Sequence, residues 1–376
     1  MDKRHADAAT VVTTARHGHG KRWLSRWVDH DGNERSRSFD RKAEAQAHIA
    51  EITGKLATGA YADPRRSGET FGAVADQWLT SKATLKPKTY AGYESLLETL
   101  ILPKWRDVPL REIDHAGIQK WVTWLSTDPE ARQRGKDKGG LSAARVIQAH
   151  QVVHQVLAYA VRARYIAANP ADAIHLPRKT TAEKIALTHD QVRQLAEASG
   201  EVSTMVYTLA YAGIRYGEAA ALRVGDVDTT RRRLTVSRSI TRVRKIGLVE
   251  GGTKTHADRK VPIPQFVADE LADVIRDRDP SEYLFPGPDG AAMTIGWFRV
   301  RFDKAAAKVG LENVTPHNLR HTAGSLALAS GASVVTVQKL LGHRNATTTL
   351  NVYAHQLPDD FDNLAAAMDK AARATR

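Results

Sequence analysis

The sequence contains no cysteine. This absence excludes disulfides, thiolate-rich zinc modules and thiol nucleophiles, so any covalent chemistry must use oxygen or nitrogen. No apolar run approaches the length that spans a membrane. The first twenty residues are polar and basic and lack the apolar stretch of a signal peptide. We therefore expect a cytoplasmic protein without a membrane partner.

Acidic residues are also few: 42 Asp and Glu stand against 55 Lys and Arg, a formal net charge of +13. Such an excess favours a polyanionic partner, either nucleic acid or an anionic membrane surface. On charge alone, a basic surface without a specific partner is an equal alternative. With 376 residues, 42% of them hydrophobic, the chain has room for two or three globular domains.

Residues 22–39 have the pattern of a β-hairpin. Aromatic and β-branched residues form the first strand, Asp31-Gly32 supplies a turn, and "RSRSF" forms the second strand. Arg35 and Arg37 share one strand face, where strict alternation would also place Phe39. We therefore expect the strand either to end before Phe39 or to bulge.

A helix follows the hairpin, and Asp40 can act as its N-cap. Gly59 is expected to end this helix. The hairpin and the helix would form a small N-terminal module, residues 1–63, and a polar linker containing proline and glycine comes next.

Apolar stripes at helical spacing predict a helical domain over about residues 69–164. The stripes run through Phe71–Leu79, Tyr90–Leu100, Ile118–Leu125 and Val146–Val161. Pro103 is expected to end the second of these helices. Aromatic residues at this spacing are usually core, so we interpret them as core and not as platforms for base stacking.

From about residue 180 onward, a helical pattern is interrupted by strand signals, which predict one small antiparallel sheet with a turn at "EGGTKTHAD". The expected fold is thus multidomain and mainly α-helical with small antiparallel β-sheets. A second basic linker, "LPRKTTAEK", precedes this region. Modules joined by basic linkers would suit a protein that wraps around DNA.

The stretch "TPHNLRHTA" places two histidines and an arginine on one helix face. Thr315-Pro316 can open the helix, so His317 lies where free N–H groups favour an anion. Arg320, one turn on, suits a bidentate grip on phosphate. A metal between the histidines would lack further ligands and would be repelled by Arg320, so the pattern favours phosphate. His321 is interpreted as a structural histidine.

Other candidate residues are ambiguous when each is judged alone. Arg215 lies at a junction between two helices, where a surface arginine is common, and Lys254 lies at a hairpin tip, where a solvated lysine is common. His343 follows the glycine that ends an apolar helix, and Tyr353 lies on the next helix, where a tyrosine normally packs.

Taken together and in this order, "GIRYGE", "TKT", "HNLRH" and "LGHRNATTTLNVYAH" resemble the catalytic boxes of the tyrosine recombinase (phage integrase) family. The upstream modules also resemble domains of that family. The resemblance implies a ββ(β)α arm-binding module, a SAM-like helical core-binding domain, and an α+β catalytic domain with a C-terminal tail helix. Their ranges are 1–63, 69–164 and 180–376.

The resemblance also implies roles for the boxed residues. Arg215 and Arg320 would bind the non-bridging oxygens of the scissile phosphate. Lys254 would be the general acid for the leaving 5′-hydroxyl, with Lys245 and Lys260 on the same strands as alternatives.

The histidines of the boxes, His317 and His343, would bind the phosphate, and His317 would also assist proton transfer. Tyr353 would be the nucleophile that forms a covalent 3′-phosphotyrosine. Glu218 matches the family's acidic residue beside the first arginine and would be structural. Neither a metal nor another cofactor is expected.

The implied function is site-specific DNA recombination, in which an integrase cleaves and rejoins strands to integrate or excise a phage or mobile element. A type IB topoisomerase and a non-catalytic DNA-binding relative are the alternatives. Expected partners are double-stranded DNA attachment sites, three further copies of the chain in a homotetramer on DNA, and DNA-bending and excisionase-type accessory proteins. The expected location is the cytoplasm of a bacterial host, at the nucleoid.

Basic residues outside the boxes are candidates for DNA contact, and binding through phosphates should weaken steeply as salt rises. The candidates are Arg35, Arg37, Lys86, Lys88, Arg178 and Lys179. After Tyr353, the residues Phe361, Leu364, Ala365 and Met368 form an apolar helical stripe. This stripe could pack on its own domain, whereas the family resemblance implies docking on a neighbouring protomer.

Overall fold

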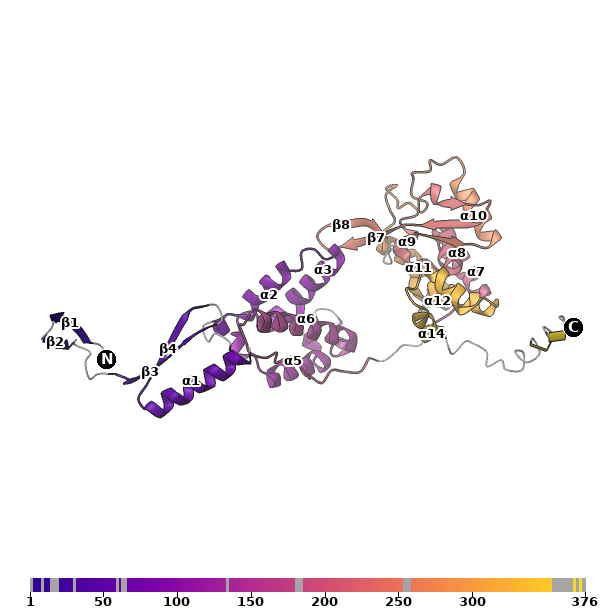
Figure 1. Cartoon of the computed structure of the whole chain (residues 1–376). Helices are drawn as coiled ribbons and strands as arrows, with labels where there is room; N and C mark the ends of the chain where they lie inside the picture. Colours follow the sequence, from indigo (N-terminus) through magenta and orange to yellow (C-terminus); the bar gives the residue numbers. More distant parts are fainter. Residues whose placement is uncertain are drawn as a thin grey trace. The chain divides into compact units, whose positions relative to one another are not determined.

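The computed structural model forms two compact units, Met1–Thr180 and Thr181–Arg376 (Figure 1). It describes residues 3–7, 10–13, 20–29, 32–58, 61, 66–132, 135–179, 185–252, 258–353, 368–369 and 372–373. The described chain is mainly helical with small antiparallel sheets, which confirms the predicted fold class. None of the described helices is both long and apolar enough to cross a membrane.

The N-terminal part of the first unit contains two β-ribbons and a helix. Its elements are β1 (Lys3–Asp7), β2 (Thr10–Thr13), β3 (Trp23–Val28), β4 (Glu34–Phe39) and α1 (Lys42–Ala57). β1 pairs with β2 and β3 with β4, both antiparallel, so the predicted hairpin is confirmed. α1 packs on β3, where Ser25 Oγ donates a hydrogen bond of 2.7 Å to the carbonyl oxygen of Ala45.

Two local predictions for this module are wrong. β4 extends through Phe39 in regular register with Trp23, without an early end or a bulge. The face accommodates both side-chain types because the guanidinium of Arg37 lies 5.3 Å from the centroid of the Phe39 ring. The N-cap of α1 is Arg41 and not Asp40, because the helix begins one residue too late for the aspartate to cap it. Gly59 lies outside the described residues.

The rest of the first unit is a helical bundle. Its main helices are α2 (Phe71–Thr80), α3 (Pro87–Leu96), α4 (Leu102–Trp105), α5 (His115–Thr127) and α6 (Ala143–Arg162). Trp78 and Trp121 are buried, which confirms that these aromatic residues are core. Pro103 does not end the second helix. A π-helical turn, Leu97–Ile101, leads from α3 into α4, and Pro103 occupies the first turn of α4, where a missing N–H breaks no helical bond.

The described part of the second unit combines helices with two small sheets. Its helices are α7 (His189–Ala198), α8 (Ser203–Ala212), α9 (Tyr216–Ala219), α10 (Gln265–Ile275), α11 (Ile295–Lys308), α12 (Pro316–Ala329), α13 (Val334–Leu341) and α14 (Ala346–Tyr353). Its strands are β5 (Val227–Asp228), β6 (Arg233–Val236), β7 (Arg238–Val243), β8 (Gly247–Gly252) and β9 (Arg259–Pro262). In the described part, the predicted single sheet is two sheets, β5-β6-β9 and β7-β8, because the chain between β6 and β7 breaks the ladder at residue 237.

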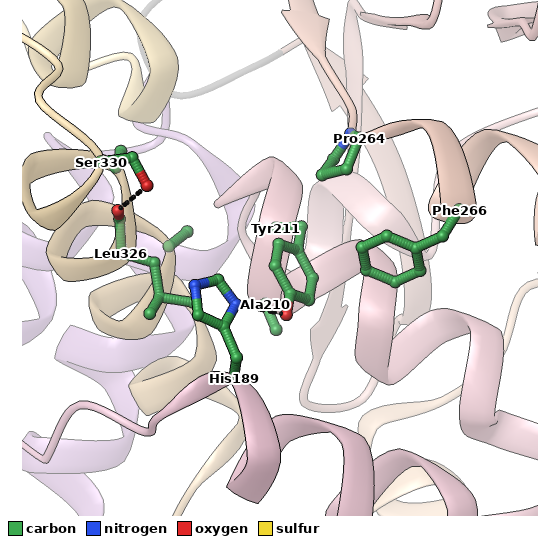
Figure 2. A pocket seen from close by; sticks show the side chains of 9 residues that line it. His189, Ala210, Tyr211, Pro264, Phe266, Leu326 and Ser330 are labelled. Carbon is green, nitrogen blue, oxygen red and sulfur yellow. Dashed lines mark hydrogen bonds between the residues drawn. The ribbon is translucent and has the colours of Figure 1, made fainter.

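An apolar pocket of about 320 Å³ lies between α8, α10 and α12 (Figure 2). Tyr211 and Phe266 meet edge to face in its wall, with ring centroids 5.0 Å apart. His189 hydrogen bonds through Nδ1 to the Tyr211 hydroxyl at 2.8 Å, and Leu326 lines the pocket from α12. The pocket therefore presents aromatic and aliphatic surface at the outside of the second unit.

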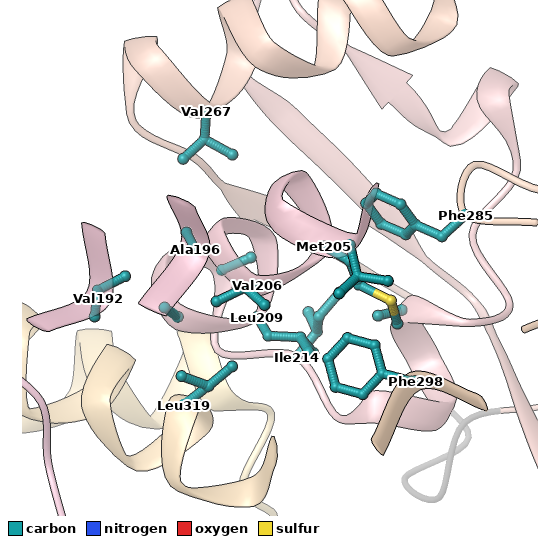
Figure 3. Close-up of a cluster of buried hydrophobic side chains, with 14 of the residues drawn as sticks. Val192, Ala196, Met205, Val206, Leu209, Ile214, Val267, Phe285, Phe298 and Leu319 are labelled. Atoms are coloured by element: carbon teal, nitrogen blue, oxygen red, sulfur yellow. The ribbon is translucent and has the colours of Figure 1, made fainter. Parts of the chain in front are cut away.

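Buried side chains from α7, α8, α10, α11 and α12 meet in one core (Figure 3). Val206 and Leu209 of α8, Phe298 of α11 and Leu319 of α12 are fully buried in it. α8 lies along α12. This packing fixes the C-terminal end of α8 beside the N-terminal half of α12, which is where the candidate site lies.

Candidate active site

Arg215, His317 and Arg320 line one cavity of about 390 Å³. The cavity lies between the start of α9 and the start of α12, and α11 contributes Arg299 to its wall. Arg299 is paired with Asp303 at 2.8 Å, which offsets part of its charge. Arg215 and Arg320 are 105 residues apart in the sequence. They and His317 nevertheless face the same positively charged cavity.

A glycine sets the position of Arg215. Gly213 ends α8 with φ +63°, in the left-handed region. A Cβ added there would lie 2.7 Å from Leu341 Cδ2, so a larger residue would also push α13 away. The chain then turns at once, and Arg215 is the N-cap residue of α9.

Glu218 is buried and holds Arg215 in place. Its Oε2 accepts a hydrogen bond of 2.9 Å from the backbone N–H of Arg215, and its Oε1 accepts another of 2.9 Å from Arg215 Nη1. The Glu218 side chain is 1% exposed. Burial would raise its pKa, but the hydrogen bond and charge of Arg259, followed by those of Arg215, outweigh that effect and lower the pKa.

Sequence reasoning missed Arg259. On β9, its Nη2 donates to Glu218 Oε2 at 2.6 Å and its Nη1 to Oε1 at 3.3 Å, while the side chain is 12% exposed. It also packs against Gly342, where an added Cβ would lie 3.1 Å from Arg259 Nε. Arg259 thus connects the segment of Arg215 to the turn that precedes His343. No local pattern marks it, since a lone arginine on a short strand is ordinary.

Arg320 is buried, with 4% of its surface exposed. Its Nη1 donates to the carbonyl oxygen of Gly213 at 2.7 Å, and its Nη2 donates to the carbonyl oxygen of Leu341. Burial, followed by the charge of Arg215, lowers the pKa of Arg320 to about 10, so the guanidinium stays charged at neutral pH. Arg320 therefore places a fixed charge and also joins α12 to the ends of α8 and α13.

His317 lies in the first turn of α12. Thr315 is the N-cap and Pro316 the first helical residue, as predicted, and the backbone N–H of Thr315 donates to Asn318 Oδ1 at 2.8 Å. Burial, followed by the charge of Arg320, lowers the pKa of His317. A neutral imidazole at a helix N-terminus inside the cavity is suited to hydrogen bond an anion.

His343 follows Gly342, which ends α13 with φ +63°. Its Nδ1 hydrogen bonds Thr349 Oγ1 at 2.9 Å, which fixes the ring. Burial, followed by the charges of Arg320 and Arg215, lowers the pKa of His343 to about 4. The same two arginines therefore act on both histidines, and the four side chains form one electrostatic cluster.

Tyr353 is the last residue of α14 and is 3% exposed. Its ring lies against Gly324 of α12, where an added Cβ would lie 2.3 Å from Tyr353 Oη. Burial raises the pKa of Tyr353 to about 12, and the charge of Arg320 partly offsets this effect. The Oη atom is 3.5 Å from His321 Nδ1 and 3.4 Å from the carbonyl oxygen of His321. His321, which is interpreted as structural from the sequence, thus lies beside the candidate nucleophile.

Lys254 lies outside the described residues, so the structure does not place it beside the others. Of the alternatives, Lys245 is exposed in the turn between β7 and β8, with φ +67°, and Lys260 is exposed on β9.

The candidate DNA contacts lie on the first unit and its C-terminal end. Arg35 Nε pairs with Asp29 Oδ2 at 2.9 Å, and Arg37 covers Phe39. The others are exposed: Lys86, Lys88, Arg178 and Lys179. Within the described ranges, no three His, Asp or Glu side chains are placed to hold a metal ion.

Two models of one protein family match the chain, and so does a relative from a bacterial prophage. A model described as "Phage integrase family" matches residues 186–359, and one described as "Phage integrase, N-terminal SAM-like domain" matches residues 70–126. Together they match more than half of the chain. A putative prophage phiRv2 integrase of Mycobacterium tuberculosis is 25% identical over 366 residues, covering 93% of each chain.

Solved structures show the same fold. The Tn1549 transposon integrase in complex with a circular intermediate DNA aligns with a TM-score of 0.66 at 23% identity, covering 80% of this chain and 99% of that one. A lambda integrase tetramer bound to a Holliday junction aligns with a TM-score of 0.54 at 17% identity, covering 86% and 93%. The chain belongs to the phage integrase family of tyrosine recombinases.

Proposed function

We propose that the cavity lined by Arg215, His317 and Arg320 is where this site-specific recombinase holds the DNA phosphate that it breaks and rejoins. The observation that carries the proposal is the convergence of two guanidiniums and a neutral imidazole on one hollow, with the hydroxyl of Tyr353 beside the same helix. Guanidiniums fit phosphate oxygens in a bidentate way.

In the proposed cleavage step, Tyr353 Oη attacks the phosphorus, the bond from phosphorus to O5′ breaks, and a 3′-phosphotyrosine forms. Negative charge grows on the non-bridging oxygens, which Arg215 and Arg320 would neutralise. Of the five N–H bonds of Arg320, two are used by Gly213 and Leu341, so others remain for phosphate. Lys254 would give a proton to the departing 5′-oxygen.

The covalent link retains the phosphodiester, so a second 5′-hydroxyl can reverse the step without ATP. Arg259 and Glu218 support this chemistry indirectly, because they fix the guanidinium of Arg215 before DNA binds. Such preorganisation is what makes charge stabilisation effective in a protein site.

The test of this function is recombination between two attachment sites on one plasmid. We expect exchange between the sites, unchanged by excess chelator, since the proposed roles need no metal. Relaxation of a supercoiled plasmid without an exchange of sites would instead indicate a type IB topoisomerase. Binding without either reaction would indicate a non-catalytic relative.

Footprinting and cleavage assays test the domain assignment. We propose that residues 1–63 bind arm-type DNA through Arg35 and Arg37, that residues 69–164 bind the core site, and that residues 180–376 carry catalysis. β3 and β4 form a two-stranded antiparallel ribbon, and the major groove of DNA admits a ribbon of this kind. A chain lacking residues 1–63 should lose arm-site footprints and keep core-site cleavage; retained arm footprints would contradict the assignment.

We further propose that four copies assemble on DNA and that the tail after Tyr353 docks in the pocket of Figure 2 on a neighbouring copy. The tail carries the apolar stripe that contains Phe361 and Met368. Met368 is 64% exposed, so its own domain leaves that part of the stripe uncovered. Phe266, 41% exposed at the pocket, offers a matching aromatic surface.

Removal of the tail before Asp359 should therefore reduce the assembly on DNA, and Phe266→Ser should do the same from the other side of the contact. We expect light scattering of the DNA complex to fall from the mass of four protomers to that of one or two. Val300→Ser is the matched control, because Val300 is 69% exposed but lies outside the pocket. A full-size assembly from the truncated chain would indicate that the tail packs on its own domain.

DNA-bending and directionality proteins complete the proposed set of partners, and the cytoplasm of a bacterial host is the proposed location. Membership of the phage integrase family supports these assignments. Purification of the chain from its host with attachment-site DNA as bait would test both.

A further inference from the structure

His321 lies between the phosphate cavity and Tyr353. It is one helical turn beyond His317 on α12, and the two rings meet edge to face with centroids 4.9 Å apart. On its other side, the ring centroid of Tyr353 is 6.3 Å away. Within the described residues, the hydrogen-bond partners of Tyr353 Oη are Nδ1 and the backbone carbonyl of His321.

The phenol of Tyr353 needs a proton acceptor. Burial raises its pKa to about 12, so the phenolate is scarce at neutral pH in the resting protein. A backbone carbonyl can align the hydroxyl but does not take its proton, whereas a neutral imidazole nitrogen can. The separation of 3.5 Å is long for a hydrogen bond, as is common for catalytic pairs before substrate binds.

The two other histidines of the cluster, His317 and His343, make different contacts. His317 lines the cavity with the arginines, where an imidazole faces the phosphate. Nδ1 of His343 is hydrogen bonded to Thr349. Neither histidine has a described hydrogen bond to Tyr353 Oη, so His321 is the one whose ring nitrogen meets the reacting atom in the described structure.

We propose that His321 is the proton acceptor for Tyr353 in DNA cleavage, an inference that rests on the proposed function. As Tyr353 Oη bonds to phosphorus, its O–H bond breaks and the proton binds His321 Nδ1. The P–O5′ bond breaks with its electron pair on O5′, which is protonated by the separate general acid. The imidazolium lies beside the phosphate, whose negative charge stabilises it. During rejoining, the imidazolium returns the proton to the departing Tyr353 oxygen.

His321→Asn tests the proposal, because asparagine keeps a hydrogen-bonding group near the position of Nδ1 but cannot accept the proton. We expect covalent adducts on a nicked attachment-site duplex to form about 100-fold more slowly. DNA affinity and thermal unfolding should stay close to those of the parent chain. Adduct formation at the parent rate would overturn the proposal.

A more acidic phenol at position 353 distinguishes two roles for His321, that of a proton acceptor and that of a structural residue. Difluorotyrosine, placed at position 353 alone, loses its proton more readily and depends less on a base. The rate gap between the parent chain and His321→Asn should then narrow by about tenfold or more. An unchanged gap would mean that His321 acts only on structure, and the proposal would be wrong. Failure of the parent chain to form any adduct would instead contradict the proposed function, and this inference with it.

Discussion

Tyr353→Phe should abolish covalent protein–DNA adducts while leaving DNA affinity unchanged. The substitution removes one oxygen atom, and that atom is the proposed nucleophile. Because the ring of Tyr353 lies against Gly324, phenylalanine keeps the packing and loses only weak hydrogen bonds, of 3.4 and 3.5 Å, to His321. The measurement is trapping on a nicked attachment-site oligonucleotide, followed by denaturing electrophoresis.

The matched control is Tyr216→Phe, a half-buried tyrosine whose hydroxyl donates a hydrogen bond of 2.8 Å to the carbonyl oxygen of Met293. Its loss should reduce stability by about 1 kcal/mol and leave adduct formation in place. Adducts that persist in Tyr353→Phe would show that another residue attacks the phosphate. Loss of DNA binding in that variant would mean that the hydroxyl serves structure.

Arg320→Ala should lower both cleavage and stability. Loss of a guanidinium that stabilises transition-state charge typically costs about 10²- to 10³-fold in rate. The buried carbonyls of Gly213 and Leu341 would also lose their donor, which should reduce the free energy of unfolding by about 2–4 kcal/mol. Single-turnover cleavage and thermal unfolding measure the two effects separately.

Arg215→Ala is the informative comparison. Arg215 is 30% exposed, and Glu218 would keep Arg259 as a partner, so stability should fall by about 1 kcal/mol at most. Cleavage should still fall by about 10²- to 10³-fold. On a methylphosphonate substrate, whose reacting group carries no charge, the defect of Arg215→Ala should shrink. An unchanged defect would contradict a role in charge neutralisation.

Much of the fold could be predicted because local patterns determined it. The apolar stripes gave the helices of the first unit, and Trp78 and Trp121 are core as expected. Predictions were wrong where packing or local geometry in the folded chain overrode an expectation based on sequence pattern. Pro103 was expected to end a helix, but a π-helical turn carries the chain past it. Phe39 stays in the strand because Arg37 covers its ring.

The sequence by itself determined the family and the set of candidate site residues, since the order and spacing of the arginine, histidine and tyrosine boxes are local properties of the chain. Only the tertiary structure decided how they are held. Glu218 and Arg259 are 41 residues apart, and their pairing depends on where β9 lies against α9. The contact of His321 with Tyr353 likewise depends on α14 lying beside α12. Hydrogen bonds and burial act over a few ångströms in space, so residues far apart in sequence become partners only when the chain has folded.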